Sequence, residues 1–174
     1  LRGVAKSAPE IDVITAFSVV QRCHKLSDKP CGRSLSWFFP RFANLPWSLR
    51  AFDILLCYAL YDSDPEKELC RANNPKETPY YGGDILTAGI NSVRGAAVEA
   101  IANLIFADKT RGAYFQYALE SIVRDKSLAV RVCAASALTA TLNYDRDLAV
   151  KLFLTLCDTE ETLLGTQTVE KFLY

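Results

Sequence analysis

Val93-Arg94-Gly95-Ala96-Ala97-Val98-Glu99-Ala100-Ile101 is repeated in altered form 37 positions later, as Val130-Arg131-Val132-Cys133-Ala134-Ala135-Ser136-Ala137-Leu138. Each version predicts a helix with small residues where its neighbours pack, and an acidic residue, Asp108 or Asp145, ends each predicted helix. A helical unit repeated at about this spacing is typical of solenoids, in which each unit buries its apolar face against the next. The two segments therefore predict an all-α fold, an α-α superhelix of stacked antiparallel helix pairs.

The shared pattern, Val-Arg-x-x-Ala-Ala-x-x-Leu/Ile, resembles the second helix of a HEAT repeat, which makes the expected fold HEAT/ARM-like. In that family an Asp in the turn pairs with the Arg of the motif, and these pairs form a ladder between neighbouring repeats. Asp125 lies five residues before Val130, where the resemblance requires this Asp, whereas Ala88 occupies the equivalent place before Val93. The resemblance covers residues 85–174 and implies a ladder that lacks one pair.

The chain divides into two parts of one continuous solenoid fragment. We expect residues 1–84 to form an N-terminal helical part with aromatic and Pro-rich loops, since all seven prolines lie at or before Pro79. Residues 85–174 predict the HEAT-like repeats. Apolar periodicity and capping residues indicate the following helices: from the capping box at Ser7 to about Leu26, Pro46 to Tyr61, Ser63 to Arg71, Ile85 to Ala88, Asn91 to Ala107, Phe115 to Ile122, Ser127 to Leu142, Leu148 to Leu156, and Asp158 or Thr159 to the end.

From its two ends, we expect the chain to be a piece of a longer protein. Leu1 is not an initiator methionine, and residues 169–174 stop inside an apolar helical pattern, although solenoids usually close with a polar repeat. The run Gly89-Ile90-Asn91-Ser92-Val93-Arg94-Gly95 is similar to one in the helical regions of large bacterial multidomain NTPases of the STAND type. Because the only glycine pair, residues 82–83, lacks the Gly-Lys-Ser/Thr ending of a phosphate loop, we expect any NTPase activity to belong to another part of the longer protein.

Composition argues against several classes of protein. The 174 residues carry no formal net charge, so there is no overall positive field to attract nucleic acid. No uncharged apolar run approaches the roughly 20 residues needed to span a bilayer, and we therefore expect no membrane partner. The six cysteines have no disulfide-framework spacing, which favours a reducing, cytoplasmic setting.

The sequence holds no pattern of catalytic or metal-ligating residues. His24 is the one histidine, and on a helix the side chain of its neighbour Cys23 points about 100° away, which argues against a nucleophile–base pair. Cys23, His24, Cys31 and Cys70 lack the C-x-x-C spacing that fixes a zinc site. We therefore predict a protein that is not an enzyme and has no metal or cofactor.

Five side chains are candidates for contact with a partner. Trp37, Arg41 and Trp47 belong to an aromatic-rich stretch that forms either a short helix or loop packed under its neighbours or a set of exposed anchors for a partner chain. Arg94 and Arg131 either form the inter-repeat ladder with Asp125 and its equivalents or lie on a concave face, where they grip acidic side chains or phosphates.

These observations favour a helical-repeat scaffold that binds another protein, or another domain of its own longer chain. The alternative is a HEAT-like domain that binds nucleic acid, since the first 60 residues hold eight Lys/Arg against four Asp/Glu. That alternative requires six basic side chains to converge on one groove. They are Arg22, Lys25, Lys29, Arg33, Arg41 and Arg50.

Overall fold

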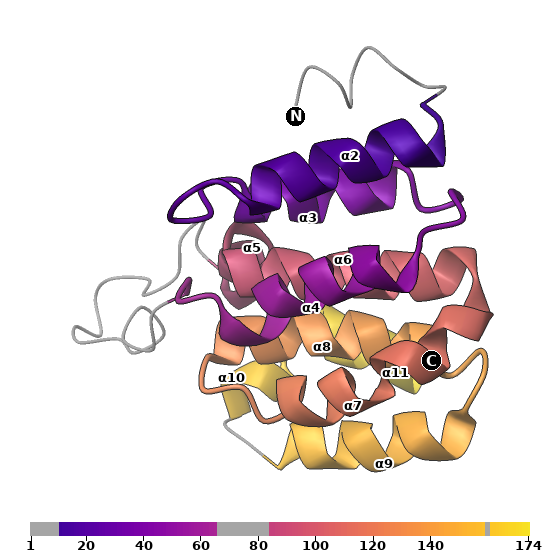
Figure 1. Cartoon of the computed structure of the whole chain (residues 1–174). Helices are drawn as coiled ribbons and strands as arrows, with labels where there is room; N and C mark the ends of the chain where they lie inside the picture. The colour runs from indigo at the N-terminus through magenta and orange to yellow at the C-terminus, as the bar shows by residue number, and fades with distance from the viewer. Residues whose placement is uncertain (1–10, 66–83, 159–160) are drawn as a thin grey trace.

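The computed structural model describes residues 11–65, 84–158 and 161–174, and every regular element in these ranges is helical. The predicted all-α class is therefore confirmed. Of the helices, α2 and α9 lie at opposite ends of the molecule, and α10 and α11 lie between them, next to α8 (Figure 1). Their bounds are α2 Val13–His24, α3 Gly32–Arg41, α4 Leu49–Tyr61, α5 Ile85–Asn91, α6 Val93–Ala107, the 3-10 turn Lys109–Arg111, α7 Gly112–Ile122, α8 Leu128–Thr141, α9 Arg146–Cys157, α10 Glu161–Leu164 and α11 Gln167–Leu173.

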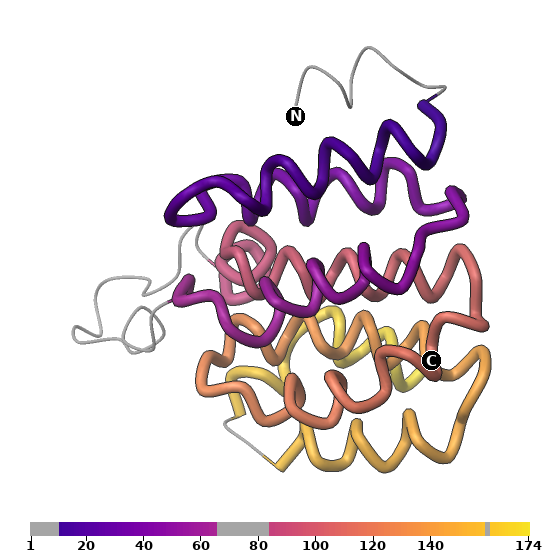
Figure 2. Tube along the Cα trace, viewed as in Figure 1, coloured from indigo at the N-terminus to yellow at the C-terminus, as the bar shows by residue number. Residues whose placement is uncertain are grey.

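The helices lie in two layers. One layer consists of α3, α6, α8 and α11, and each of these helices contacts the next. The other consists of α2, α4, α7 and α9, in which α2 contacts α4 and α4 contacts α7. The trace in Figure 2 passes between the layers along the chain, and the α10–α11 segment lies against α8. A single hydrophobic cluster extends from Ala16 to Val169, so the segments on either side of residues 66–83 share one core.

The two versions of the repeated segment meet at the centre of this core. They lie in α6 and α8, which make the most extensive helix contact in the described residues. Ala97 and Ala134 are both fully buried, as their small-residue pattern predicts. Because the distance between packed helices depends on the side chains at the contact, small residues let α6 and α8 approach closely.

The N-terminus of α6 differs from the prediction by one residue. Its N-cap is Ser92 and not Asn91: the Ser92 Oγ accepts a hydrogen bond from the Gly95 backbone N–H at 3.1 Å. Asn91 is instead the last residue of α5 and donates through its Nδ2 to the Thr87 carbonyl at 2.8 Å. Ser92 takes the cap because its backbone is extended, which breaks the helix there and points the hydroxyl at the free N–H groups of α6.

Asp108 ends α6 as predicted, whereas α8 already ends at Thr141, so Asp145 lies beyond that helix; both acidic residues start the next element. Asp108 accepts a hydrogen bond from the Thr110 N–H at 3.0 Å and so caps the 3-10 turn before α7. Asp145 accepts one from the Leu148 N–H at 2.9 Å and caps α9. Both satisfy N–H groups that have no partner within their own helix.

The C-terminal segment forms two short helices where the sequence predicted one. α10 ends at Leu164, and α11 starts at Gln167 after Gly165 and Thr166. Glycine disfavours a helix interior, and Thr166 has the extended backbone of an N-cap. The predicted capping box at Ser7 and most of the helix predicted from Ser63 to Arg71 lie outside the described residues, as does Thr159.

Candidate functional site

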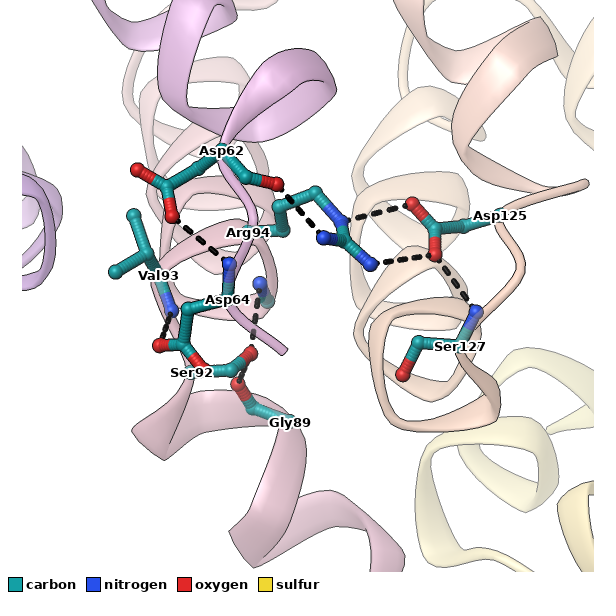
Figure 3. A network of polar contacts seen from close by, with 9 residues as sticks. Asp62, Asp64, Gly89, Ser92, Val93, Arg94, Asp125 and Ser127 are labelled. Atoms are coloured by element: carbon teal, nitrogen blue, oxygen red, sulfur yellow. Dashed lines mark hydrogen bonds and ion pairs between the residues drawn. The ribbon is translucent and has the colours of Figure 1, made fainter. Parts of the chain in front are cut away.

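The first candidate, Arg94, lies in an internal polar network that joins three segments: the loop after α4, the start of α6 and the turn before α8 (Figure 3). Its Nε and one terminal nitrogen donate to the two carboxylate oxygens of Asp125 at 3.1 and 3.2 Å, and its other terminal nitrogen donates to the Asp62 carbonyl at 2.7 Å. The same Asp125 carboxylate accepts a hydrogen bond from the Ser127 N–H at 2.8 Å. The Arg94–Asp125 ion pair that the resemblance implies is present, and Arg94 is buried, so its side chain is not open to a partner as its candidacy as a contact residue requires.

Asp64, which was not singled out from the sequence, binds the first turn of α6. Its carboxylate accepts a hydrogen bond from the Val93 N–H at 2.8 Å, and its carbonyl accepts one from the Arg94 N–H at 3.0 Å. These N–H groups belong to the first turn of α6, where they have no partner within the helix. A loop that is 29 positions distant in sequence thus fixes both the start of α6 and the orientation of Arg94.

Arg131, the counterpart of Arg94 in the second segment, is half-buried on α8. Within the described residues it forms no ion pair, and its buried Nε has no hydrogen-bond partner. In the described part of the chain, Arg94 thus has the ion pair with an aspartate that the resemblance implies, and Arg131 has none.

The two candidate tryptophans occupy different environments. Trp47 is 7% exposed, packs on Phe39 with ring centroids 4.9 Å apart, and donates from Nε1 to the Phe42 carbonyl at 2.9 Å. It belongs to the core, which corrects its candidacy as an exposed anchor. Trp37 is 56% exposed on α3, and Arg41, the last residue of that helix, is also exposed. The aromatic stretch thus forms a helix that buries one face and presents Trp37 on the other.

His24 and the nearby cysteines pack at the turn between α2 and α3. The Nδ1 of His24 lies 3.2 Å from the hydroxyl of Tyr58, and burial, together with the charge of Lys29, lowers the pKa of His24. Burial and the neighbouring Cys31 thiol raise the pKa of Cys23. No group of three or more His, Cys, Asp or Glu side chains with metal-site geometry occurs in the described ranges, and Cys70 lies outside them.

The six basic residues that a nucleic-acid site would need divide between the two ends of α3. Arg33 and Arg41, near these two ends, are eight positions apart, a distance of about 12 Å along a helix. Four of the six surround the turn between α2 and α3, and two lie at the connection to α4. The first group is Arg22, Lys25, Lys29 and Arg33, and the second is Arg41 and Arg50.

A groove not predicted from the sequence runs across the layer formed by α3, α6, α8 and α11. It consists of two adjoining pockets of about 310 and 230 Å³ that share Glu99 and Asn103 of α6 as lining residues. We call it the Glu99 groove. The first pocket lies between α3 and α6 and is lined by Ser36, Trp37, Pro40, Ile90, Ala96, Glu99 and Asn103. The second reaches α8 and α11 and is lined by Glu99, Ala102, Asn103, Phe106, Ser136, Thr139, Thr168 and Lys171.

Glu99 is half-buried at the junction of the two pockets. One of its carboxylate oxygens accepts a hydrogen bond from the Ser136 hydroxyl at 2.8 Å. Burial raises the pKa of Glu99, against the opposing effects of the hydrogen bonds from Ser136 and Cys133 and of the charge of Lys171. Among the described residues the ion pairs are Arg94–Asp125 and Arg111–Asp108, so Glu99 is a desolvated carboxylate without an ion-pair partner there.

The sequence contains a signal for this groove. Glu99 and Asn103 are four residues apart and Phe106 follows three residues later, so they form a stripe on one side of a helix that is otherwise small and apolar. Glu99 and Ser136 are also equivalent positions of the two repeated segments, 37 residues apart, and they meet across the α6–α8 contact. A polar pair at matching positions of neighbouring helices indicates the surface on which both helices are open to solvent.

Replacing Glu99 by glutamine is expected to raise the free energy of unfolding at pH 7. A carboxyl group whose pKa is raised by folding adds stability below its unfolded pKa, and this contribution is lost as the pH rises through the folded value. Glutamine removes the buried charge and keeps an oxygen that can accept the Ser136 hydrogen bond. The gain should shrink as the pH falls towards about 4, the usual range of glutamate. Urea unfolding at both pH values measures it.

The matched control for this experiment is Glu170→Gln, since Glu170 is exposed on α11. It should leave the unfolding free energy within about 0.5 kcal/mol of the wild type at both pH values. Destabilisation by Glu99→Gln at pH 7 that becomes smaller at pH 4 would contradict the prediction, because it would show that an internal partner stabilises the ionised Glu99 carboxylate.

The chain matches no protein-family model, no curated protein and no solved structure. Among the helices of the described ranges, none has the length and apolar character needed to cross a membrane.

Proposed function

We propose that this chain is a non-catalytic, HEAT-like helical-repeat scaffold whose Glu99 groove binds a segment of another protein or of another domain of a longer chain. The observation that supports it is the position of the groove. It crosses successive helices of one layer, α3, α6, α8 and α11, so a bound segment contacts several helical units together. In helical-repeat proteins the surface formed by successive units is the one that extended partners occupy.

The size and lining of the groove favour a peptide over a small metabolite. Each pocket, at about 310 or 230 Å³, lies at or below the lower end of the range of small-molecule sites. Two such pockets side by side suit consecutive side chains of one segment. The groove also carries two exposed aromatic side chains, Trp37 and Phe106, of the kind that anchors protein interfaces.

The HEAT-like arrangement is supported by the two layers of helices and by the Arg94–Asp125 pair, which joins α6 to the turn before α8. A superhelix of stacked antiparallel pairs accounts for both. We further propose a cytoplasmic setting, in keeping with cysteine thiols that pack among apolar side chains. The nucleic-acid alternative has less support, because the basic residues that it needs divide between the two ends of α3.

The test is a selection of random peptides displayed on phage against the immobilised chain. Selected peptides are then synthesised and titrated against the wild type and against Asn103→Trp, in which a large side chain blocks both pockets. We expect affinity to fall about tenfold or more in Asn103→Trp, a loss of about 1.4 kcal/mol. The control is Tyr117→Trp, which changes a residue that is 76% exposed on α7, in the other layer, and should bind as the wild type does.

Peptides that bind Asn103→Trp as tightly as the wild type would contradict the proposed function. Titration with a DNA duplex at low and high salt tests the alternative in parallel. Binding that weakens steeply with salt and is unaffected by Asn103→Trp would favour the nucleic-acid function instead.

A further inference from the structure

We infer that the α3–α6 pocket of the Glu99 groove receives a lysine or arginine side chain of the bound segment, with its charged head at the Glu99 carboxylate. This inference rests on the proposed function and adds the chemistry of the partner. It concerns the pocket between α3 and α6, of about 310 Å³, which is lined by Trp37, Pro40, Ile90, Ala96 and Glu99 among others.

The first step of the argument is charge. Among the described residues that line this pocket, Glu99 is the charged one, so the formal charge of the lining is negative. The carboxylate is held by a hydrogen bond from Ser136 at 2.8 Å, but it has no ion-pair partner among the described residues. A desolvated carboxylate without a cation costs stability, and a cation that enters the pocket recovers it through a charge-assisted hydrogen bond.

The second step is the shape and polarity of the rest of the pocket. Pro40, Ile90 and Ala96 provide apolar surface, and Glu99 lies where α6 separates the two pockets. Lysine and arginine have this same division, with an apolar stem and a charged head. Trp37 adds an exposed indole in the same pocket, and indole rings attract cations over their faces.

The third step distinguishes the two pockets. Lys171 lines the second pocket and acts on Glu99 from that side, since its charge opposes the rise in the pKa of Glu99. A cation in the second pocket would therefore be repelled by Lys171, whereas no basic residue lines the pocket between α3 and α6. The same carboxylate disfavours an acidic side chain or a phosphate in either pocket.

The experiment uses the full chain and the synthetic peptides selected on it. Each lysine of a peptide is replaced by norleucine, or each arginine by citrulline, which removes the charge and keeps most of the shape. We expect one such position whose replacement weakens binding to the wild type about tenfold or more. The same replacement should have little effect on binding to Glu99→Gln, because the interaction is already lost there. Glu170→Gln, which also removes one carboxylate, should retain the wild-type difference.

The outcomes separate this inference from the proposed function. Peptides that lose affinity for Asn103→Trp but tolerate neutral replacement of every lysine and arginine would overturn the inference and leave the scaffold function standing. A basic position whose effect persists in Glu99→Gln would also overturn it, since the cation would then bind elsewhere. Thermal unfolding of Glu99→Gln checks folding, and we expect this variant to be at least as stable as the wild type at pH 7.

Discussion

Replacing Gly89 by alanine is expected to destabilise the protein by about 3 kcal/mol, the upper end of the cost of overpacking a core. A Cβ at this position would lie 2.1 Å from the Ala129 carbonyl oxygen and 2.7 Å from the Sγ of Cys133. The first of these atoms is backbone, so the clash is relieved only if α5 moves away from α8. Alanine is the better helix former by about 1 kcal/mol, and this gain opposes the clash without offsetting it.

Urea unfolding of the wild type and of the variant measures the difference, because the midpoint and slope give the unfolding free energy. Gly165→Ala is the matched control: nothing lies within 4 Å of the added Cβ, between α10 and α11. We expect its effect to lie between zero and a gain of about 1 kcal/mol. A loss of less than about 0.5 kcal/mol in Gly89→Ala would mean that α5 and α8 do not approach as closely as the structure indicates.

This contact also explains why the break between α5 and α6 was only partly predictable. The sequence predicted a short helix, a cap at Asn91 and a long helix. Asn91 and Ser92 are both good capping residues, so residue type alone does not distinguish them. The choice is made by tertiary packing. Gly89 must lie against Ala129, and a Cβ on Gly95 would meet the Gly89 carbonyl at 2.2 Å, so the chain bends at Ser92.

The core was more predictable than the surface that carries the candidate site. Ala97 and Ala134 belong to a repeated pattern, and repetition indicates which face of each helix is buried. Glu99 was missed because a single acidic residue on a helix usually lies on a solvated face. Its partial burial depends on α3, α8 and α11, which come together only in the folded chain.

The candidate tryptophans illustrate the same limit. Trp37 and Trp47 both lie in one aromatic stretch, and the sequence of that stretch does not indicate which of the two indole rings is buried. In the structure α3 ends at Arg41 and the chain turns back, so that the Trp47 indole reaches the Phe42 carbonyl at 2.9 Å. Trp37 lies on the face of α3 that does not pack into the core, and it is exposed. Periodicity predicts the face of a helix, but it does not predict the path of the loop that follows.

Replacing Arg94 by methionine is expected to cost about 3–5 kcal/mol, because it leaves the Asp125 carboxylate partly buried without its cation. The side chains of the pair are 11% and 14% exposed, and the nitrogen–oxygen distance is 3.1 Å. The substitution also removes the hydrogen bond to the Asp62 carbonyl, at 2.7 Å, that connects the loop after α4 to α6. Methionine keeps much of the buried volume, so the loss reports the charge and hydrogen bonds rather than a cavity.

A double-mutant cycle with Asp125→Asn isolates the pair. Asparagine keeps an oxygen for the Ser127 N–H, which Asp125 engages at 2.8 Å. The double variant should cost less than the sum of the two single variants, since either change alone already breaks the pair. The control is Asp108→Asn, whose carboxylate is 43% exposed and lies 3.6 Å from Arg111; exposed pairs of this kind contribute about 0–1 kcal/mol. If the two single losses simply add, or if Arg94→Met costs less than about 1 kcal/mol, the Arg94–Asp125 pair does not hold α6 to the turn before α8. The proposed HEAT-like arrangement would then lose the ion pair that supports it.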